Sequence, residues 1–287
     1  MSVDKQSFAK SSKWPQYVAG LAGAGGAFAS GTALGWPAPA GPRLVGENDR
    51  YFPMTQSEFD WIASVITIGL AFSCLPVGFL MNKFGRKGTM LALVVPFLVG
   101  WALIIWAQNF VMMLIGRFIL GLAGGCFCIS APQYSTEISE NEIRGILGTF
   151  FQLLVIAGIL FVYVIGAFVP IFWTNVICSI FPLVYGAILL LMPESPVYFM
   201  LKEKEEDAAK SLKWLRGDNF DTSSEIEALR TELRMSEEAP KISKRKAFSE
   251  PAAIWSIVII GGMVVVQQFS GVSVVLFFTT NIFIVSI

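Results

Sequence analysis

The stretch Ile254 to Phe278 reads IWSIVIIGGMVVVQQFSGVSVVLFF, an apolar run long enough to cross a bilayer that carries two adjacent glutamines and a Ser-Gly break. In hydrocarbon each polar amide needs a partner, so Gln267 and Gln268 must face protein, water or a polar ligand. The stretch therefore predicts a helix that lines a solute pathway rather than one that only anchors the chain.

The composition of the whole chain predicts an all-α, polytopic membrane protein. Of its 287 residues 54% are hydrophobic and 15% charged, and the mean hydropathy is +0.63, which is too apolar for an ordinary soluble domain of this length. The four cysteines lie in apolar stretches and read as small packing residues. Seven stretches are long enough to span a membrane, roughly Trp14–Trp36, Trp61–Met81, Thr89–Ala107, Val111–Ala131, Ile146–Ala167, Phe172–Met192 and Ala252–Phe278.

Basic residues predict how these spans are oriented. Lys5, Lys10 and Lys13 precede the first span, and Lys83, Arg86 and Lys87 lie in the short turn between the second and the third. Positive charge collects in cytoplasmic loops, so both segments and the amino terminus are expected in the cytoplasm. The segment 37–60 is then the first external loop.

The connection between the sixth and seventh spans is highly charged. Residues 197–250 hold 23 of the 42 charged side chains. Two short amphipathic helices are expected there, and the alternative is a charged, disordered linker. The expected units are a six-span bundle over residues 1–192, a cytoplasmic helical loop over 193–251 and the seventh span over 252–287. The apolar stripes comprise Leu201, Ala208, Leu212 and Leu215, with Gly217 as a stop, and then Ile226, Leu229 and Leu233.

Charged residues at the predicted helix ends form a candidate gating network. Arg86, Glu137, Arg144 and Glu194 all lie at predicted cytoplasmic ends, where ion pairs could form in one state and break in another. A lone arginine at helix depth costs about 2.5–3.5 kcal/mol, so Arg117 should lie near an interface or have partners. The alternative is ordinary positive-inside signalling with solvated surface pairs.

Five short motifs together carry a family resemblance. They stand in order along the chain as GFLMNKFGRK (Gly78–Lys87), GRF (Gly116–Phe118), PQYSTE followed by RG (Pro132–Gly145), PESP (Pro193–Pro196) and QQFSG (Gln267–Gly271). This set resembles the sugar porter family of the major facilitator superfamily. The run Gly31–Trp36 is most similar to insect facilitated trehalose transporters. The resemblance implies a major facilitator fold, here the N-terminal six-helix bundle and the first helix of the C-terminal half, in the plasma membrane.

The same resemblance implies sugar contacts. Gln152, Gln267 and Gln268 match sugar-contacting positions, and a neutral amide suits a hydroxyl because it both donates and accepts. Ser273 stands where the family usually has Asn, which leaves the identity of the sugar open. The alternative for each glutamine is an interhelical hydrogen bond, worth about 0.6 kcal/mol.

Absences in the sequence bear on mechanism. The first span has no Asp, Glu or His, so facilitated diffusion of trehalose or a hexose is expected rather than proton coupling. The chain has no histidine, and neither a metal cluster nor an activated nucleophile is visible, so no enzyme activity, metal, cofactor or nucleic-acid partner is expected. The family has twelve spans, whereas this sequence ends within or just after the seventh. The alternative function is therefore a truncated, non-transporting fragment or isoform of such a transporter, with its C-terminal half missing.

Overall fold

The computed structural model describes residues 11–45, 51–217, 220–238, 251–272 and 274–275. These residues form helices, and their only strand-like pairing is an isolated bridge between Val45 and Met54. In chain order the helices are α1 (Trp14–Gly35), α2 (Pro37–Leu44), α3 (Gln56–Phe72), α4 (Cys74–Ile105), α5 (Phe110–Ile138), α6 (Arg144–Phe168), α7 (Ile171–Leu190), α8 (Pro196–Leu201), α9 (Glu205–Arg216), α10 (Ser223–Glu238) and α12 (Pro251–Phe269).

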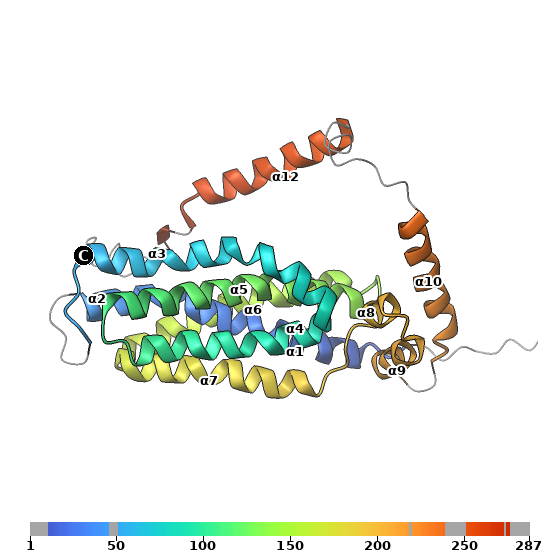
Figure 1. Cartoon of the computed structure of the whole chain (residues 1–287), viewed down its shortest axis with the longest axis horizontal. Helices are drawn as coiled ribbons and strands as arrows, with labels where there is room; N and C mark the ends of the chain where they lie inside the picture. The colour runs from blue at the N-terminus through green and yellow to red at the C-terminus, as the bar shows by residue number, and fades with distance from the viewer. Residues whose placement is uncertain (1–10, 46–50, 218–219, 239–250, 273, 276–287) are drawn as a thin grey trace, which may run out of the picture.

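The long helices lie side by side in one bundle (Figure 1). Helix α5 packs against α3, α4 and α1, and α1 also packs against α6 and α7. Helices α8, α9 and α10 gather at one end of the bundle, here called the loop-helix end, and α2 lies at the opposite end, here called the far end. Helix α12 is drawn apart from the bundle.

Four described helices, α4 to α7, are long and apolar enough to cross a membrane. The predicted second span runs across the junction between α3 and α4 at Ser73, where the backbone stays helical. The third span forms the later part of α4. Between them Gly85 leaves helical geometry, with φ 84° and ψ 177°, and Figure 1 shows the chain turning back along the bundle there. A positive φ of this kind suits glycine because it has no Cβ.

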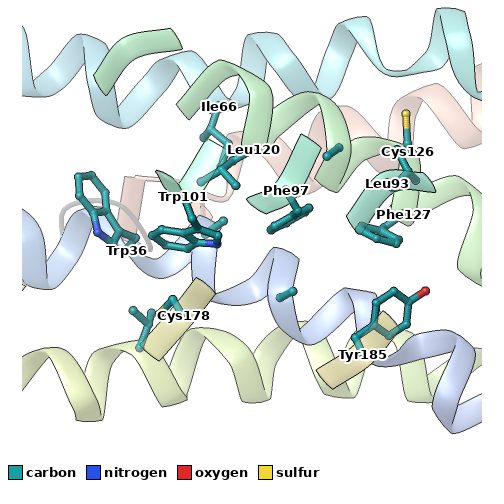
Figure 2. Close-up of a cluster of buried hydrophobic side chains, with 14 of the residues drawn as sticks. Trp36, Ile66, Leu93, Phe97, Trp101, Leu120, Cys126, Phe127, Cys178 and Tyr185 are labelled. Carbon is teal, nitrogen blue, oxygen red and sulfur yellow. The ribbon is translucent and has the colours of Figure 1, made fainter. Parts of the chain in front are cut away.

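A row of glycines lets α1 and α6 approach closely. The Val155 carbonyl lies against Gly31, and the Phe28 carbonyl lies against Gly158, so neither position has room for a side chain. Farther into the bundle, buried aromatic rings fill the space between α1, α4, α5 and α7 (Figure 2). Trp36, Phe97, Trp101, Phe127 and Tyr185 belong to this core.

The segment predicted as a wholly external loop contains a helix. Helix α2 follows α1 after only Trp36, whose backbone is helical, and it buries Ala38, Ala40 and Leu44. Pro37 stands at its first position, where proline is tolerated because that N–H would have no helical partner.

The charged connection forms helices, as one of the two readings predicted. Ala208, Leu212 and Leu215 are fully buried on α9, which ends at Gly217 with φ 104°. Leu201 was wrongly expected on the same helical face. It ends the separate short helix α8 and is exposed, because Glu203 takes φ 59° and turns the chain before α9 begins.

Candidate functional site

The Gly85 turn creates a binding place for one carboxylate. Three successive amides, those of Arg86, Lys87 and Gly88, donate to the side chain of Glu194 at 3.0, 2.9 and 3.1 Å. They are the first N–H groups of the helix that restarts after Gly85, and they have no helical acceptor of their own. A negative charge is stabilised there by the free amides and by the helix dipole.

The Arg86 side chain joins this carboxylate site to α5. Its guanidinium contacts the Glu137 carboxylate at 2.8 and 2.9 Å, and the two side chains are only 5% and 12% exposed. Glu137 also accepts from Gln133 at 3.0 Å and from the hydroxyl of Ser195. We call Arg86, Glu137 and Glu194 the end cluster. It brings together three of the five residues predicted for the gating network.

Further bonds tie the end cluster to neighbouring elements. Tyr134 donates to the Pro193 carbonyl at 2.7 Å, and Ser211 of α9 donates to the Glu194 carbonyl at 2.6 Å. The Lys87 ammonium donates to the carbonyls of Leu190 and Met192 at 3.0 and 2.6 Å, at the carboxyl end of α7. The loop helices are therefore bonded to the bundle at the same place where its ion pair is buried.

Arg216 provides a second attachment of the loop helices. Its side chain is 2% exposed and donates to the Ile138 carbonyl at 2.8 Å and to Glu225 at 2.7 and 3.2 Å, and Glu140 lies 3.4 Å away. Sequence reasoning placed this arginine only among the loop charges. At the same end Lys13 pairs with Glu142, and this hydrogen bond raises the pKa of Lys13.

Arg144 lies at this end but outside the ion pair. It is exposed and lines a cavity of about 400 Å³ together with Glu137, Arg216 and Glu225. The structure thus places Arg144 beside the end cluster rather than in contact with Arg86.

Arg117 lies toward the far end, twenty residues before Glu137 on α5 and therefore about 30 Å away along the helix. It is fully buried and donates to the carbonyls of Ala33 and Ile62 at 2.5 and 3.2 Å. Its guanidinium also lies 4.9 Å from the ring centre of Trp36, a cation–π distance. Arg117 therefore has partners, as expected, but they are two backbone carbonyls and an aromatic ring. They lie at the opposite end of the bundle from the end cluster.

Around Trp36 the structure shows a polar network that sequence reasoning missed. The Trp36 indole N–H donates to Asn175 Oδ1 at 2.6 Å, and the Asn175 amide donates to the Tyr51 hydroxyl at 3.1 Å. Asn175 is fully buried on α7. A buried amide in an apolar helix was the available signal, because such a group requires partners.

The predicted sugar-contacting residues lie on two helices. Gln152 is exposed on α6, and Gln267 and Gln268 are exposed near the end of α12. Figure 1 draws α12 away from α6, so the structure does not bring the three glutamines together. Ser273 lies outside the described residues. In the described part of the chain no group of three His, Cys, Asp or Glu side chains is placed to hold a metal.

Comparisons with known proteins give matches over most of the chain. A family model described as sugar (and other) transporter matches residues 3–284. Glucose transporter type 3 of Drosophila melanogaster is 29% identical over 256 residues, which are 89% of this chain and 50% of that protein. Facilitated trehalose transporter Tret1 of Polypedilum vanderplanki is 30% identical over 275 residues, 94% of this chain and 54% of that protein. The chain thus spans about half the length of these relatives.

Solved structures show the same fold. The partially occluded inward-open conformation of the xylose transporter XylE from E. coli aligns over 94% of this chain and 66% of that one. The TM-score is 0.73 at 22% sequence identity.

Proposed function

Because this chain belongs to the sugar (and other) transporter family and is a multi-pass membrane protein, we propose that it serves in facilitated transport of a sugar, trehalose or a hexose, by alternating access. The observation that carries the mechanism is the end cluster. A buried ion pair at one end of the bundle is a contact that can break when that end opens.

We propose that the protein lies in the plasma membrane with its loop-helix end on the cytoplasmic side. Lys13, Lys83 and Lys87 lie at that end of the spans, as the positive-inside rule requires of cytoplasmic segments. The charged helices α9 and α10 then lie in cytoplasmic water. The far end, with α2, faces the outside.

The proposed sugar contacts are Gln152, Gln267, Gln268 and Ser273. An exposed glutamine on a membrane helix is stable only against water or a polar partner, and a sugar hydroxyl can be that partner. The glutamines of α12 would approach Gln152 in a closed arrangement of the carrier.

The proposed driving force is the sugar gradient alone. Helix α1 contains no titratable carboxylate or imidazole, so a proton has no carrier group in the span that packs against both α5 and α6. Uptake should then equilibrate the sugar without concentrating it.

Uptake of labelled trehalose and glucose into proteoliposomes tests this proposal. The full chain is reconstituted alone and with the carboxyl-terminal half of the Polypedilum trehalose transporter. Gln268→Ala is expected to lower uptake roughly twofold to tenfold at equal protein, because one hydrogen bond to sugar contributes about 0.5–1.5 kcal/mol. Gln56→Ala, at the exposed start of α3, is the matched control.

A protonophore should leave the uptake unchanged. Accumulation against the gradient that collapses with the protonophore would overturn facilitated diffusion. Absence of saturable uptake in both preparations would overturn the transport proposal itself.

A further inference from the structure

A cavity of about 260 Å³ lies at the far end between α2 and α6. We call it the α2–α6 cavity. Pro39, Pro42 and Arg43 of α2 line one side, and Tyr163 and Ala167 of α6 line the other. The end cluster and the candidate sugar contacts use none of these residues.

The cavity continues the helical face that begins at Gln152. On α6 the positions of Gln152, Ile156, Ile159, Tyr163 and Ala167 are spaced by four, three, four and four residues, which places them along one face. Tyr163 is eleven residues from Gln152, about 17 Å along the helix toward the far end. A solute that reached Gln152 from the far end along this face would pass Tyr163 first.

The lining combines the two kinds of surface that a sugar ring presents. The proline and tyrosine rings offer apolar faces to the ring C–H groups, and the tyrosine hydroxyl both donates and accepts. Small-molecule sites are largely apolar with a few placed polar groups, and this cavity lies just below their lower size limit of about 300 Å³. It suits one ring of a sugar.

Arg43 is held in place at the cavity by the end of α6. Its guanidinium donates to the Ala167 carbonyl at 3.0 Å and to the Val169 carbonyl. A cation is also favourable at the carboxyl end of a helix. The guanidinium is therefore already held in position before a sugar binds. A positioned donor of this kind needs little reorganisation when a hydroxyl binds.

We infer that the α2–α6 cavity is an outer subsite for one pyranose ring, on the same pathway wall as Gln152. The inference rests on the proposed sugar transport and adds an entry position to it. The ring would lie against Pro39 and Tyr163 with hydroxyls toward Arg43, before it moves along α6.

Cysteine protection locates the site on the full chain. Single variants Ala167→Cys, Gln152→Cys and Gln56→Cys are made in a background in which the exposed Cys74 is replaced by Ser. A membrane-impermeant methanethiosulfonate reagent is applied to proteoliposomes with trehalose, glucose or the open-chain polyol sorbitol. Trehalose or glucose is expected to slow modification of the Ala167→Cys variant at least threefold and to leave the Gln56→Cys control unchanged.

A second variant tests the chemistry of the lining. Adding Tyr163→Phe to Ala167→Cys removes one hydroxyl and keeps the ring, so the sugar concentration for half protection should rise severalfold. Unchanged protection would contradict the role of the tyrosine hydroxyl.

Comparison of the cysteine variants distinguishes failure of the subsite from failure of the transport proposal. Protection of Gln152→Cys without protection of Ala167→Cys overturns the outer subsite and leaves sugar transport standing. Protection of neither position overturns the subsite, and the uptake assay described above then decides whether the transport proposal stands. An Ala167→Cys thiol that the aqueous reagent cannot reach does not line an open entry path, and this result also overturns the subsite. Equal protection by sorbitol overturns it as well.

Discussion

Two arginines of this bundle are buried, and each avoids an unpaired charge in a different way. Arg86 faces the Glu137 carboxylate, whereas Arg117 uses the carbonyls of Ala33 and Ile62 and the ring of Trp36. A carboxylate pair can be exchanged for water when the bundle end opens. Carbonyls of packed helices are fixed, which makes Arg117 a structural tie at the far end and Arg86 the residue suited to a moving contact.

Glu137→Gln should destabilise the protein much more than Arg144→Ala. It leaves the buried Arg86 guanidinium beside a neutral amide. Loss of one charged partner from a buried ion pair costs roughly 3–5 kcal/mol of folding free energy, and a hydrogen bond from Arg86 to the new amide oxygen offsets part of this cost. Arg144 is exposed, so its change should stay within about 0.5 kcal/mol. Thermal unfolding of the purified chain measures both. Equal losses would show that Glu137 is a solvated surface charge.

Asn175 and Trp36 should be energetically coupled. Asn175→Leu leaves the buried Trp36 N–H without its acceptor, which costs about 1–3 kcal/mol. Trp36→Phe removes that donor, so the double variant should be less destabilised than the sum of the single variants by at least about 0.5 kcal/mol. A double-mutant cycle on unfolding free energies provides the measurement, and strict additivity would contradict the hydrogen bond.

At the scale of helices, the sequence predicted what depends on local pattern. The stripe of Ala208, Leu212 and Leu215 with Gly217 after it predicted α9, since period and stop signal are both local. Helix α2 was missed because the whole segment 37–60 was assigned to an external loop, whereas burial of Ala38, Ala40 and Leu44 against the bundle decides its conformation. Of the site, the charges at helix ends predicted the end cluster. The Trp36–Asn175 bond joins residues 139 positions apart, which no local pattern reveals.

Glycine substitutions on α6 should have opposite effects at two positions. A Cβ at Gly158 would meet the backbone of α1, including the Thr32 nitrogen at 3.0 Å, and backbone cannot rotate away. Gly158→Ala should therefore lower the melting temperature. Gly148 has open space around its Cβ position, so Gly148→Ala should stabilise α6 by about 0.5–1 kcal/mol. Parallel melting curves test the pair, and a neutral Gly158→Ala would refute the close approach of the helices.

At the scale of the whole molecule, the two ends of the bundle are closed by different means. The far end is tied through uncharged acceptors, in the network of Trp36, Asn175 and Tyr51 and in the backbone carbonyls that hold Arg117 and Arg43. The loop-helix end is tied by charges, the end cluster and Arg216. Ionic contacts to buried groups respond to the loss of a single partner, so the loop helices depend on few side chains for their attachment.

Arg216→Gln should loosen the loop helices without unfolding the bundle. It replaces the charge-assisted bonds to Ile138 and Glu225 by weaker amide contacts. A net loss equal to one such bond, about 1.5–3 kcal/mol, should make amide hydrogen exchange over Glu205–Arg216 roughly tenfold to a hundredfold faster. Lys213→Gln, exposed on the same helix, should leave the exchange unchanged. Faster exchange throughout α5 and α6 as well would mean that Arg216 supports the whole bundle.

The distribution of tryptophans gives the unlabelled protein an optical property. Trp36 and Trp101 are fully buried in the core of Figure 2. Lipids with brominated chains and aqueous iodide together should quench the fluorescence of the exposed indoles. The remaining fluorescence should come from the buried pair and have its maximum at short wavelength. A red shift of the residual emission would then signal that solvent has reached the far end of the bundle. The remaining indoles, all exposed, are those of Trp14, Trp61, Trp106, Trp173, Trp214 and Trp255.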